Sequence, residues 1–312
     1  MRIGLDMMGG DYAPEQACLG VIHFLSTYSD CHLVLLGDQE AIRKGIPQWE
    51  SLPVTIVSTQ DEIGMHEHPT KAMKEKPNSA MVVGFGMLAK GALDAFLSAG
   101  NTGVMLVGAS HMVKNVEGLL RPSIPTPVPQ LSGGYSIMLD IGINADCKPE
   151  YLNQFAVLGT VYARDILGMD SPRVGLLNIG EEEGKGNLLA QATYPLLKEN
   201  SKINFIGNIE GRDLIDDKTD IILTDGFTGN ILLKFAESLY DVIRVKANVE
   251  SEFLDRFNHR IYAGVPVLGC RKPVVVGHGV SLSDSFSGML ELGRKMIQSR
   301  MCEKMEHIFT EA

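Results

Sequence analysis

The sequence predicts an α/β protein built on a doubly wound, mostly parallel sheet. Short apolar runs alternate with longer periodic segments along the chain. The apolar runs are continuous rather than alternating, as in parallel strands that are covered on both faces. There is no repeat of fixed period and no low-complexity tract, so we expect a single domain over residues 1–312.

Each predicted strand is a short apolar run, and each predicted helix is a longer periodic segment between such runs. In chain order, the strands are Ile3–Met7, Leu33–Leu36, Val54–Val57, Ala95–Ser98, Ser136–Leu139, Val174–Ile179, Ile203–Ile206, Ile221–Thr224 and Val274–Val276. The helices are Pro14–Leu25, Ala80–Lys90, Asn101–Val113, Tyr151–Leu167, Leu188–Glu199, Gly229–Arg260 and Ser283–Ile308. The proline-rich stretch 121–134 is predicted to be a loop.

Four turns share one pattern, in which an apolar run ends, Gly with Asn, Thr or Ser follows, and a helix begins. They lie within residues 96–106, 176–189, 221–233 and 274–285. In a doubly wound sheet such turns lie at the carboxyl ends of the strands, where ligands bind. Backbone N–H groups at a helix start favour an anion. An ordinary capped βα loop is the alternative for any one turn, but four in one chain favour an anion site.

The turn with the most specific signal reads GLLNIGEEEGKGNLLAQA (175–192) and holds a lysine between two glycines. Lys185 would supply the cation, and we expect the N–H groups of Gly186 and Asn187 to assist at the start of the next helix. The three preceding glutamates would repel an anion. We therefore expect at least two to point to solvent, or one to hold the lysine. The alternative is a plain surface lysine.

The composition excludes several classes of function. A net charge of −10 disfavours nucleic-acid binding, which needs clustered Lys and Arg. Five scattered cysteines without a CxxC pair favour a reducing compartment and no zinc site. The start of the chain does not resemble a signal peptide and no apolar run is long enough to span a bilayer, so we expect a cytoplasmic protein.

Known cofactor and metal motifs do not account for the turns. The P-loop pattern GxxxxGK[ST] is absent, and GxGxxG does not follow the first strand. His66 and His68 form an HxH pair without a third ligand nearby, so we assign no metal. Asp6 and Asp11 flank the first turn, where we expect them to order neighbouring loops rather than to act in catalysis.

Six segments occur in an order that resembles one family. They are MGGDYAP (8–14), SAGNTG (98–103), GLLNIGEE followed by KGN (175–187), GNIEGRD (207–213), DGFTGN (225–230) and GHG (277–279) with Ser281. Over essentially the whole chain they are similar to the bacterial phosphate acyltransferases of phospholipid synthesis. The resemblance implies a three-layer α/β/α fold of the isopropylmalate dehydrogenase and phosphate acetyltransferase group, a homodimer, and no cofactor.

The resemblance also implies a reaction. Inorganic phosphate attacks the thioester of a long-chain acyl carrier protein, and a membrane glycerol-3-phosphate acyltransferase then uses the acyl phosphate. The family's catalytic residues correspond to Lys185 of KGN and Asn230 of DGFTGN. Phosphate is already an anion, so no activated nucleophile is needed and we expect direct attack. Lys185 would hold the phosphate, and Asn230 with turn N–H groups would orient it or donate to the thioester oxygen.

The phosphate-binding residues expected from the turns are Asn101, Thr102, Gly103, Gly186, Asn187, Thr228, Gly229 and His278. His278 would donate to phosphate or protonate the leaving thiolate, and a structural histidine at a strand end is the alternative.

The predicted helical stretch at about 229–260 is a candidate surface for contacts with partners. Apolar residues between Ile231 and His259 form an amphipathic stripe, for which a dimer or core contact is favoured and membrane-surface binding is the alternative. We expect the stretch to protrude or to lie at the dimer contact. The stretch is shorter than is usual in the family. An acidic carrier protein would need a basic patch. The candidates are Lys71, Lys74, Lys76, Arg244, Lys246, Arg256 and Arg260.

Three other functions compete with this interpretation. A coenzyme A-dependent phosphate acetyltransferase would differ in its acyl donor. An oxidoreductase of the isopropylmalate dehydrogenase type would need a carboxylate cluster for a metal and a nicotinamide site, and the sequence shows neither. A scaffold that binds the carrier protein at the inner face of the membrane would not need Lys185 or Asn230.

Overall fold

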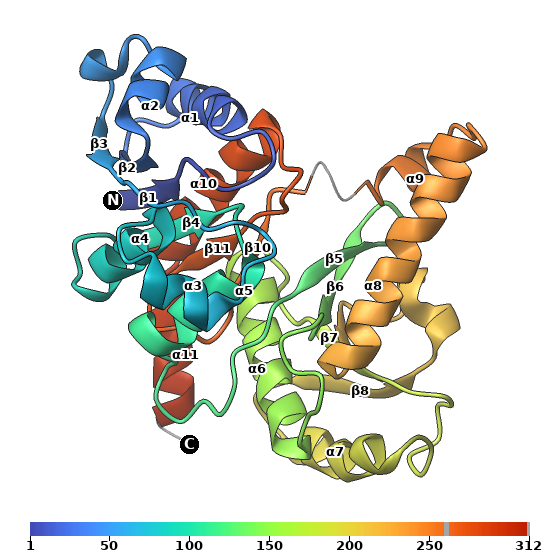
Figure 1. Cartoon of the computed structure of the whole chain (residues 1–312). Coiled ribbons are helices and arrows are strands. Elements are labelled where there is room, and N and C mark those ends of the chain that lie inside the picture. Colours follow the sequence, from blue (N-terminus) through green and yellow to red (C-terminus); the bar gives the residue numbers. More distant parts are fainter. Residues whose placement is uncertain (259–261, 311–312) are drawn as a thin grey trace. The chain divides into compact units, whose positions relative to one another are not determined.

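The computed structural model describes residues 1–258 and 262–310 and divides into two compact units, each with its own sheet. The first unit comprises residues 1–116 and the described residues of 259–303, and the second comprises 117–258 and the described residues of 304–312. In Figure 1 residues 1–116 of the first unit run from blue to blue-green, and residues 117–258 of the second run from green through yellow to orange. The sequence predicted one sheet, and the structure has two, whereas the single domain over residues 1–312 stays a prediction.

The first unit holds a six-stranded sheet in the order β10-β11-β4-β1-β2-β3, parallel except that β10 runs antiparallel to β11. Its strands are β1 (Arg2–Asp6), β2 (His32–Gly37), β3 (Val54–Ser58), β4 (Ala95–Ser98), β10 (Val265–Pro266) and β11 (Val274–Val276). Its helices are α1 (Glu15–Thr27), α2 (Gln39–Gly45), η1 (Trp49–Ser51), α3 (Pro69–Glu75), α4 (Ala80–Ala89), α5 (Thr102–Gly108), η2 (Ala109–Val113) and α10 (Ser283–Gln298). Helix α11 (Met301–Thr310) contributes residues to both units.

The second unit holds a five-stranded sheet in the order β5-β6-β9-β7-β8, parallel except for the antiparallel pair of β5 and β6. Its strands are β5 (Thr126–Pro129), β6 (Tyr135–Leu139), β7 (Arg173–Leu177), β8 (Asn204–Ile209) and β9 (Ile221–Leu223). Its helices are α6 (Pro149–Asp165), α7 (Leu188–Glu199), η3 (Gly211–Ile215), α8 (Gly226–Tyr240), η4 (Asp241–Lys246) and α9 (Glu252–Asp255).

Helices cover both faces of the second sheet, because neighbouring residues of a strand point to opposite faces. Ile221 of β9 faces Gly159 of α6, where an added Cβ would meet its side chain at 3.2 Å. Ile222, the next residue, lies in a cluster that also contains Leu232 and Leu233 of α8. Both faces are therefore buried, which is why the strands read as continuous apolar runs.

The α/β class with mostly parallel strands is confirmed, and each of the nine predicted strands is present to within a few residues. Strands β5 and β10 were not predicted. Both contain proline and lie at sheet edges, where a missing N–H costs no ladder hydrogen bond. The stretch 121–134 was predicted to be a loop because its prolines obscured β5.

Two predicted helices differ in extent from those of the structure. Helix α8 begins at Gly226, three residues early, because the Asp225 side chain accepts from the Thr228 N–H at 2.8 Å and caps it. Regular α-helix ends at Tyr240, and residues 259–260 of the predicted helix lie outside the described residues. The helix predicted at 283–308 is two helices, since Arg300 between them has a φ of 54°. Among the described residues, no helix is long and apolar enough to cross a bilayer.

Candidate functional site

The four predicted turns form two pairs, one on each sheet (Figure 1). In the second unit β7 and β9 are parallel neighbours, so the turns that follow them lie at the same edge of the sheet. In the first unit β4 and β11 are parallel neighbours, and their turns are likewise adjacent. Each sheet thus presents one pair of turns at the carboxyl ends of its strands, which is the usual position of ligands in such sheets.

A pocket of about 480 Å³ opens at the β7 and β9 turns of the second unit, within the size range of small-molecule sites. It is lined by Leu152, Leu176, Leu177, Asn178, Ile179, Gly186, Asn187, Leu189, Ala190, Thr224, Asp225 and Thr228. Three of the predicted site residues are among them. The two predicted catalytic residues adjoin the lining in sequence, since Lys185 precedes Gly186 and Asn230 follows Thr228 by two positions.

The backbone around Lys185 is held by amide side chains. Asn178 Nδ2 donates to the Lys185 carbonyl at 3.1 Å, and Asn208 Nδ2 donates to the Glu182 carbonyl at 2.9 Å. Gln191 Nε2 donates to the carbonyls of the two glycines that flank the lysine, at 3.2 and 3.0 Å. These bonds fix where the lysine side chain starts. The sequence analysis did not single out the three amides, although Asn178 and Asn208 lie within the segments LLNIG and GNIEGRD.

The glutamates before Lys185 pair with other lysines. Glu181 accepts from Lys218 Nζ at 2.5 Å, and Glu183 accepts from Lys198 Nζ at 3.0 Å. Neither holds Lys185, which is exposed and whose ammonium pairs with no residue that the structure describes. The lysine is thus available to an outside anion, and the charges of two of the three glutamates are offset.

The two glycines that flank Lys185 are not equivalent. Gly186 has a φ of +93°, and a Cβ there would lie 2.2 Å from Asn178 Oδ1. A Cβ on Gly184 would meet nothing within 4 Å. Only the second glycine is therefore required by the backbone of the turn.

Alanine at Gly186 is expected to destabilise the protein by about 1–3 kcal/mol, because a Cβ strains this backbone and displaces Asn178. Alanine at Gly184 is expected to change stability by less than about 0.5 kcal/mol. Urea unfolding of the two variants beside the parent chain measures both. Equal destabilisation by both substitutions would contradict the assignment.

Several predicted phosphate-binding groups also have structural roles in the second unit. Asn187 Oδ1 caps α7 by accepting from the Ala190 N–H at 2.8 Å. Thr228 donates through its N–H and its hydroxyl to Asp225, at 2.8 and 2.9 Å. A Cβ on Gly229 would lie 2.0 Å from the carbonyl oxygen of Asp140, so this glycine permits close packing of α8. The first turn of α8 therefore offers fewer free donors than its sequence indicates, and phosphate binding by these residues stays a prediction.

The Asn230 side chain is half-buried near the loop that follows β6. Its Nδ2 donates to the Ile141 carbonyl at 3.1 Å, which uses one of its two N–H groups and fixes the plane of the amide. The loop itself is held by Asp140, which is fully buried and accepts from the N–H and Nδ2 of Asn144 at 2.7 and 2.8 Å. Burial raises the pKa of the Asp140 carboxyl, and the bonds from Asn144 oppose that rise.

Asp140 was missed in the sequence analysis, although a signal is present. It ends an apolar run as SIMLD, just as Asp6 ends the run RIGLD at β1. A carboxyl directly after a buried strand indicates a group that orders the next loop.

In the first unit the side chain of Asn101 is fully engaged. Its Oδ1 caps α5 by accepting from the Val104 N–H, and its Nδ2 donates to three backbone carbonyls of residues 64–67, at 3.0 to 3.1 Å. Thr102 is exposed at the start of α5, and Gly103 faces Pro69. His278 is exposed, and its Nδ1 accepts from the Val280 N–H at 3.4 Å.

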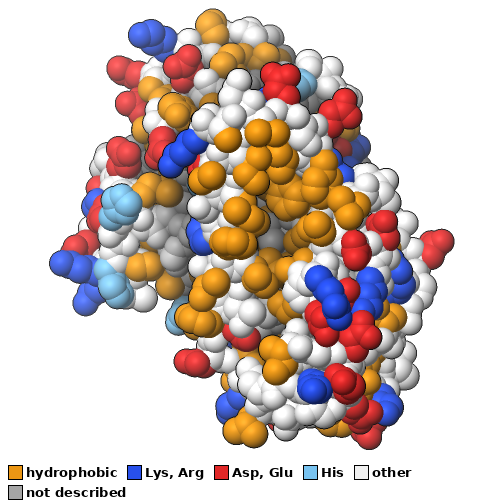
Figure 2. All heavy atoms as spheres, turned by 90° about the vertical axis from the view of Figure 1, so that its right-hand side faces the viewer, with side chains coloured by type: hydrophobic (Ala, Val, Ile, Leu, Met, Phe, Trp, Pro, Cys, Tyr) orange, Lys and Arg blue, Asp and Glu red, His pale blue; other side chains and the backbone are white. Residues whose placement is uncertain are grey.

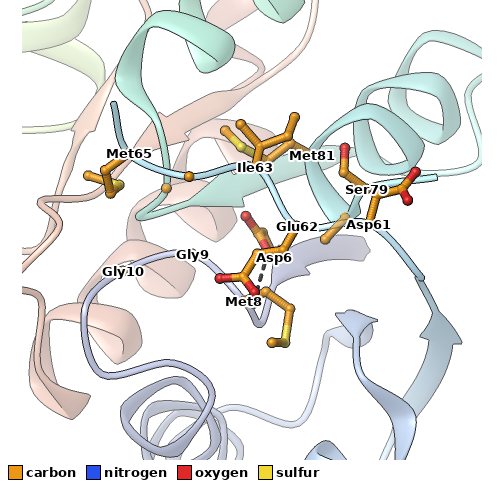
Figure 3. Close-up of a pocket in the computed structure, with 13 residues that line it drawn as sticks. Asp6, Met8, Gly9, Gly10, Asp61, Glu62, Ile63, Met65, Ser79 and Met81 are labelled. Carbon is orange, nitrogen blue, oxygen red and sulfur yellow. Dashed lines mark hydrogen bonds between the residues drawn. The ribbon is translucent and has the colours of Figure 1, made fainter. Parts of the chain in front are cut away.

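A smaller pocket of about 60 Å³ lies beside the β1 turn of the first unit and is acidic (Figure 3). Asp6, Asp61 and Glu62 are among its lining residues. The Asp6 carboxyl accepts from Ser98 Oγ at 2.7 Å and the Met8 N–H at 2.9 Å, which is the loop-ordering role predicted for it. Burial raises its pKa, and the charge of Glu62 adds to the rise. Such a lining repels phosphate. Among the described residues, no group of three His, Cys, Asp or Glu side chains is placed to hold a metal.

Of the predicted site residues, the second unit brings Lys185, Gly186 and Asn187 to one sheet edge with Thr228, Gly229 and Asn230. Asn101, Thr102, Gly103 and His278 belong to the first unit.

Comparisons with known proteins show the family of this chain. The family described as "Fatty acid synthesis protein" matches residues 1–304. Phosphate acyltransferase of Dictyoglomus thermophilum is 38% identical over 325 residues, covering 98% of this chain and 96% of the relative. The enzyme of the same name from Bacillus subtilis is 36% identical over 319 residues, covering 96% of both chains. That from Salinibacter ruber is 39% identical over 330 residues, covering 99% and 97%.

Solved structures show a related fold at low identity. A phosphotransacetylase from Streptococcus pyogenes has a TM-score of 0.65 at 16% identity, covering 96% of this chain and 94% of its own. A branched-chain phosphotransacylase from Enterococcus faecalis also has a TM-score of 0.65 at 16% identity, covering 95% and 99%.

Proposed function

The chain belongs to the phosphate acyltransferase family, and we propose that it transfers a long-chain fatty acyl group from acyl-[acyl-carrier-protein] to inorganic phosphate. It is an acyltransferase, and phosphate is its acyl acceptor. The observation that carries the proposal is Lys185, an exposed lysine whose side chain has no described partner, whose backbone is held by Asn178, and which directly precedes the pocket-lining Gly186. The acyl phosphate would be used in phosphatidic acid synthesis by a membrane glycerol-3-phosphate acyltransferase.

In the proposed reaction a phosphate oxygen attacks the thioester carbon, the C–O bond forms, and the C–S bond breaks to release the carrier thiolate. The barrier is lowered by holding two reactants together and by stabilising the oxyanion. Lys185 supplies the positive charge for phosphate. Asn230, with its amide plane fixed by Ile141, supplies an N–H donor.

Donor preference tests this function. Purified protein is mixed with phosphate and either palmitoyl-acyl carrier protein or palmitoyl-coenzyme A, and acyl phosphate is trapped with hydroxylamine. Product from the carrier-protein donor supports the proposal. Product from coenzyme A alone would assign the chain a coenzyme A-dependent activity instead. If neither donor gives product, the proposed reaction fails.

We also propose that the protein is a homodimer through α8. Hydrophobic side chains gather along the face that carries α8 (Figure 2). The exposed apolar residues of α8 and η4 are Phe227, Ile231, Phe235, Leu239, Val242 and Val245, and we call them the α8 stripe. They recur every three or four residues, so they share one helix face. The flanking charges have mixed sign, with Glu237 paired to Lys234, which favours a protein partner over an anionic membrane.

Aspartate at Phe235, in the middle of the α8 stripe, is expected to convert the dimer to a monomer, because it places an unpaired charge in an apolar interface. Light scattering after gel filtration measures the mass. The control is Leu167→Asp, which adds the same charge at an exposed apolar residue outside the α8 stripe. A parent chain that is already monomeric, or a Phe235 variant that stays dimeric, would overturn this interface.

Several of the basic residues expected to dock the acidic carrier protein have partners within the chain. Lys76 pairs with Glu67, and Arg244 pairs with Asp255. Arg256 donates to the Gln130 carbonyl at 2.8 Å. Lys71, Lys74 and Lys246 are exposed and remain as the proposed contacts, whereas Arg260 lies outside the described residues. The proposed location is the cytoplasm, with peripheral attachment at the inner face of the membrane as the alternative.

A further inference from the structure

The pocket of the second unit has an apolar wall that phosphate chemistry does not explain. Leu152 of α6, Leu176 and Leu177 of β7, and Leu189 and Ala190 of α7 line it. Three separate elements therefore contribute aliphatic side chains to one cavity. Its polar residues, Asn178, Asn187, Thr224, Asp225 and Thr228, come from the turns that follow β7 and β9, which are the turns that carry the predicted chemistry.

The lining is poorly suited to an anion or a nucleotide. None of the twelve lining residues is Lys, Arg or aromatic. The one charged residue is Asp225, whose carboxylate is occupied by both donors of Thr228. A phosphate inside the pocket would meet this negative charge without a cation. An aliphatic chain would meet leucine side chains and no unpaired charge.

The rim of the pocket is apolar as well. Ile179, at the start of the loop that carries Lys185, has a side chain that is 82% exposed. Covering such a side chain is favourable because it removes apolar surface from water. A ligand with an aliphatic portion would cover it, whereas a small hydrophilic ligand would leave it in water.

We propose that this pocket receives the aliphatic chain of the acyl donor, with the thioester carbonyl at the polar side beside Lys185 and Asn230. The inference rests on the proposed function and adds to it the pocket that determines the preferred length of the acyl chain. The carbonyl carbon then lies where Gly186 and Thr228 line the pocket, one and two positions in sequence from Lys185 and Asn230. The methylene groups pack on Leu177 and Leu189.

The test fills the pocket and measures chain-length preference. Leu189→Trp adds bulk inside the pocket, and Leu188→Trp adds the same bulk one residue earlier, at a side chain that is 86% exposed and outside the lining. Butyryl-, octanoyl- and palmitoyl-acyl carrier protein are compared by kcat/KM. For Leu189→Trp the palmitoyl-to-butyryl ratio is expected to fall by about tenfold or more, and for Leu188→Trp by less than about twofold.

An unchanged ratio in Leu189→Trp, or an equal loss with all three donors, would overturn the proposal. Binding of the fluorescent fatty acid cis-parinaric acid measures the affinity of the pocket for an aliphatic chain without turnover. It therefore tests the pocket assignment independently of the proposed reaction. Its Kd is expected to rise about tenfold in Leu189→Trp and to stay near the parent value in Leu188→Trp. Ala190→Leu fills the same pocket from the next position and serves if the tryptophan variant does not fold. Wild-type protein that binds the probe but forms no acyl phosphate would contradict the reaction and leave the pocket assignment supported.

Discussion

Replacing Lys185 with alanine is expected to lower acyl phosphate formation about 100- to 1000-fold, the usual effect of removing one group that stabilises developing charge. The side chain is exposed and no described residue pairs with its ammonium, so its removal breaks no described side-chain hydrogen bond or ion pair. The thermal midpoint is therefore expected to stay at the parent value. Hydroxylamine trapping over a range of phosphate concentrations measures turnover and the KM for phosphate.

Lys198→Ala is the matched control. It removes a lysine that pairs with Glu183 of the same loop and leaves Lys185 in place. Surface ion pairs contribute little to stability, so this variant is expected to fold and to keep activity within a few-fold. If Lys185→Ala retains parental turnover, or if both variants lose activity equally, then Lys185 is a plain surface cation.

The two surface ion pairs of this loop have an electrostatic role. Glu181 and Glu183 carry negative charge a few residues before Lys185, the residue proposed to hold phosphate. Opposite charges at hydrogen-bond distance cancel most of the field that an anion would meet farther away. Lys218 and Lys198 supply that cancellation, so Lys185 acts on phosphate with less opposition. The run of three glutamates is thereby compatible with an anion site.

The strands could be predicted because their signal is local. A buried parallel strand needs a continuous apolar run, and Ala95–Ser98 and Val274–Val276 were predicted with the bounds that the structure has. The pairing of strands is not local. Nothing in the composition of Val274–Val276 indicates that it pairs with β4, from which it is separated in sequence by residues 117–258 of the second unit. The division into two sheets was therefore beyond sequence reasoning.

The turns of the candidate site could be predicted for the same reason, since Gly, Asn and Thr after an apolar run are a local pattern. The groups that hold the turns could not. Asn208 reaches the Glu182 carbonyl from another strand, and Asp140 approaches Gly229 only because β6 and β9 are neighbours. Asn101 looked like a ligand donor, yet its amide is used by carbonyls 34 to 37 residues away in sequence.

Alanine at Asn230 is the second large expected effect, and it distinguishes between two roles. Removing one oxyanion donor typically costs about 100- to 1000-fold in kcat. If Asn230 donates to the thioester oxygen, kcat falls and the KM for phosphate is unchanged, because the lost bond forms only in the transition state. If Asn230 orients phosphate, the KM for phosphate rises. Steady-state kinetics with phosphate as the varied substrate separates the two.

The Asn230 side chain has one described hydrogen bond, which Nδ2 donates to the Ile141 carbonyl. Activity could therefore fall because the loop after β6 is disturbed, and a control must exclude this alternative. Asn200→Ala removes a comparable amide, whose Nδ2 donates to Asn153 Oδ1 at 2.8 Å from the far end of α7. Asn230→Ala loses one neutral hydrogen bond, whereas Asn200→Ala loses two, because Asn200 Oδ1 also accepts from the Lys202 N–H at 3.0 Å. Each bond is expected to contribute about 0.5–1.5 kcal/mol of stability, so the control is destabilised at least as much as the Asn230 variant. Only the Asn230 variant is expected to lose activity beyond a few-fold. Turnover and phosphate KM that stay at the parent values in Asn230→Ala would show that the amide serves the loop after β6 and not the reaction.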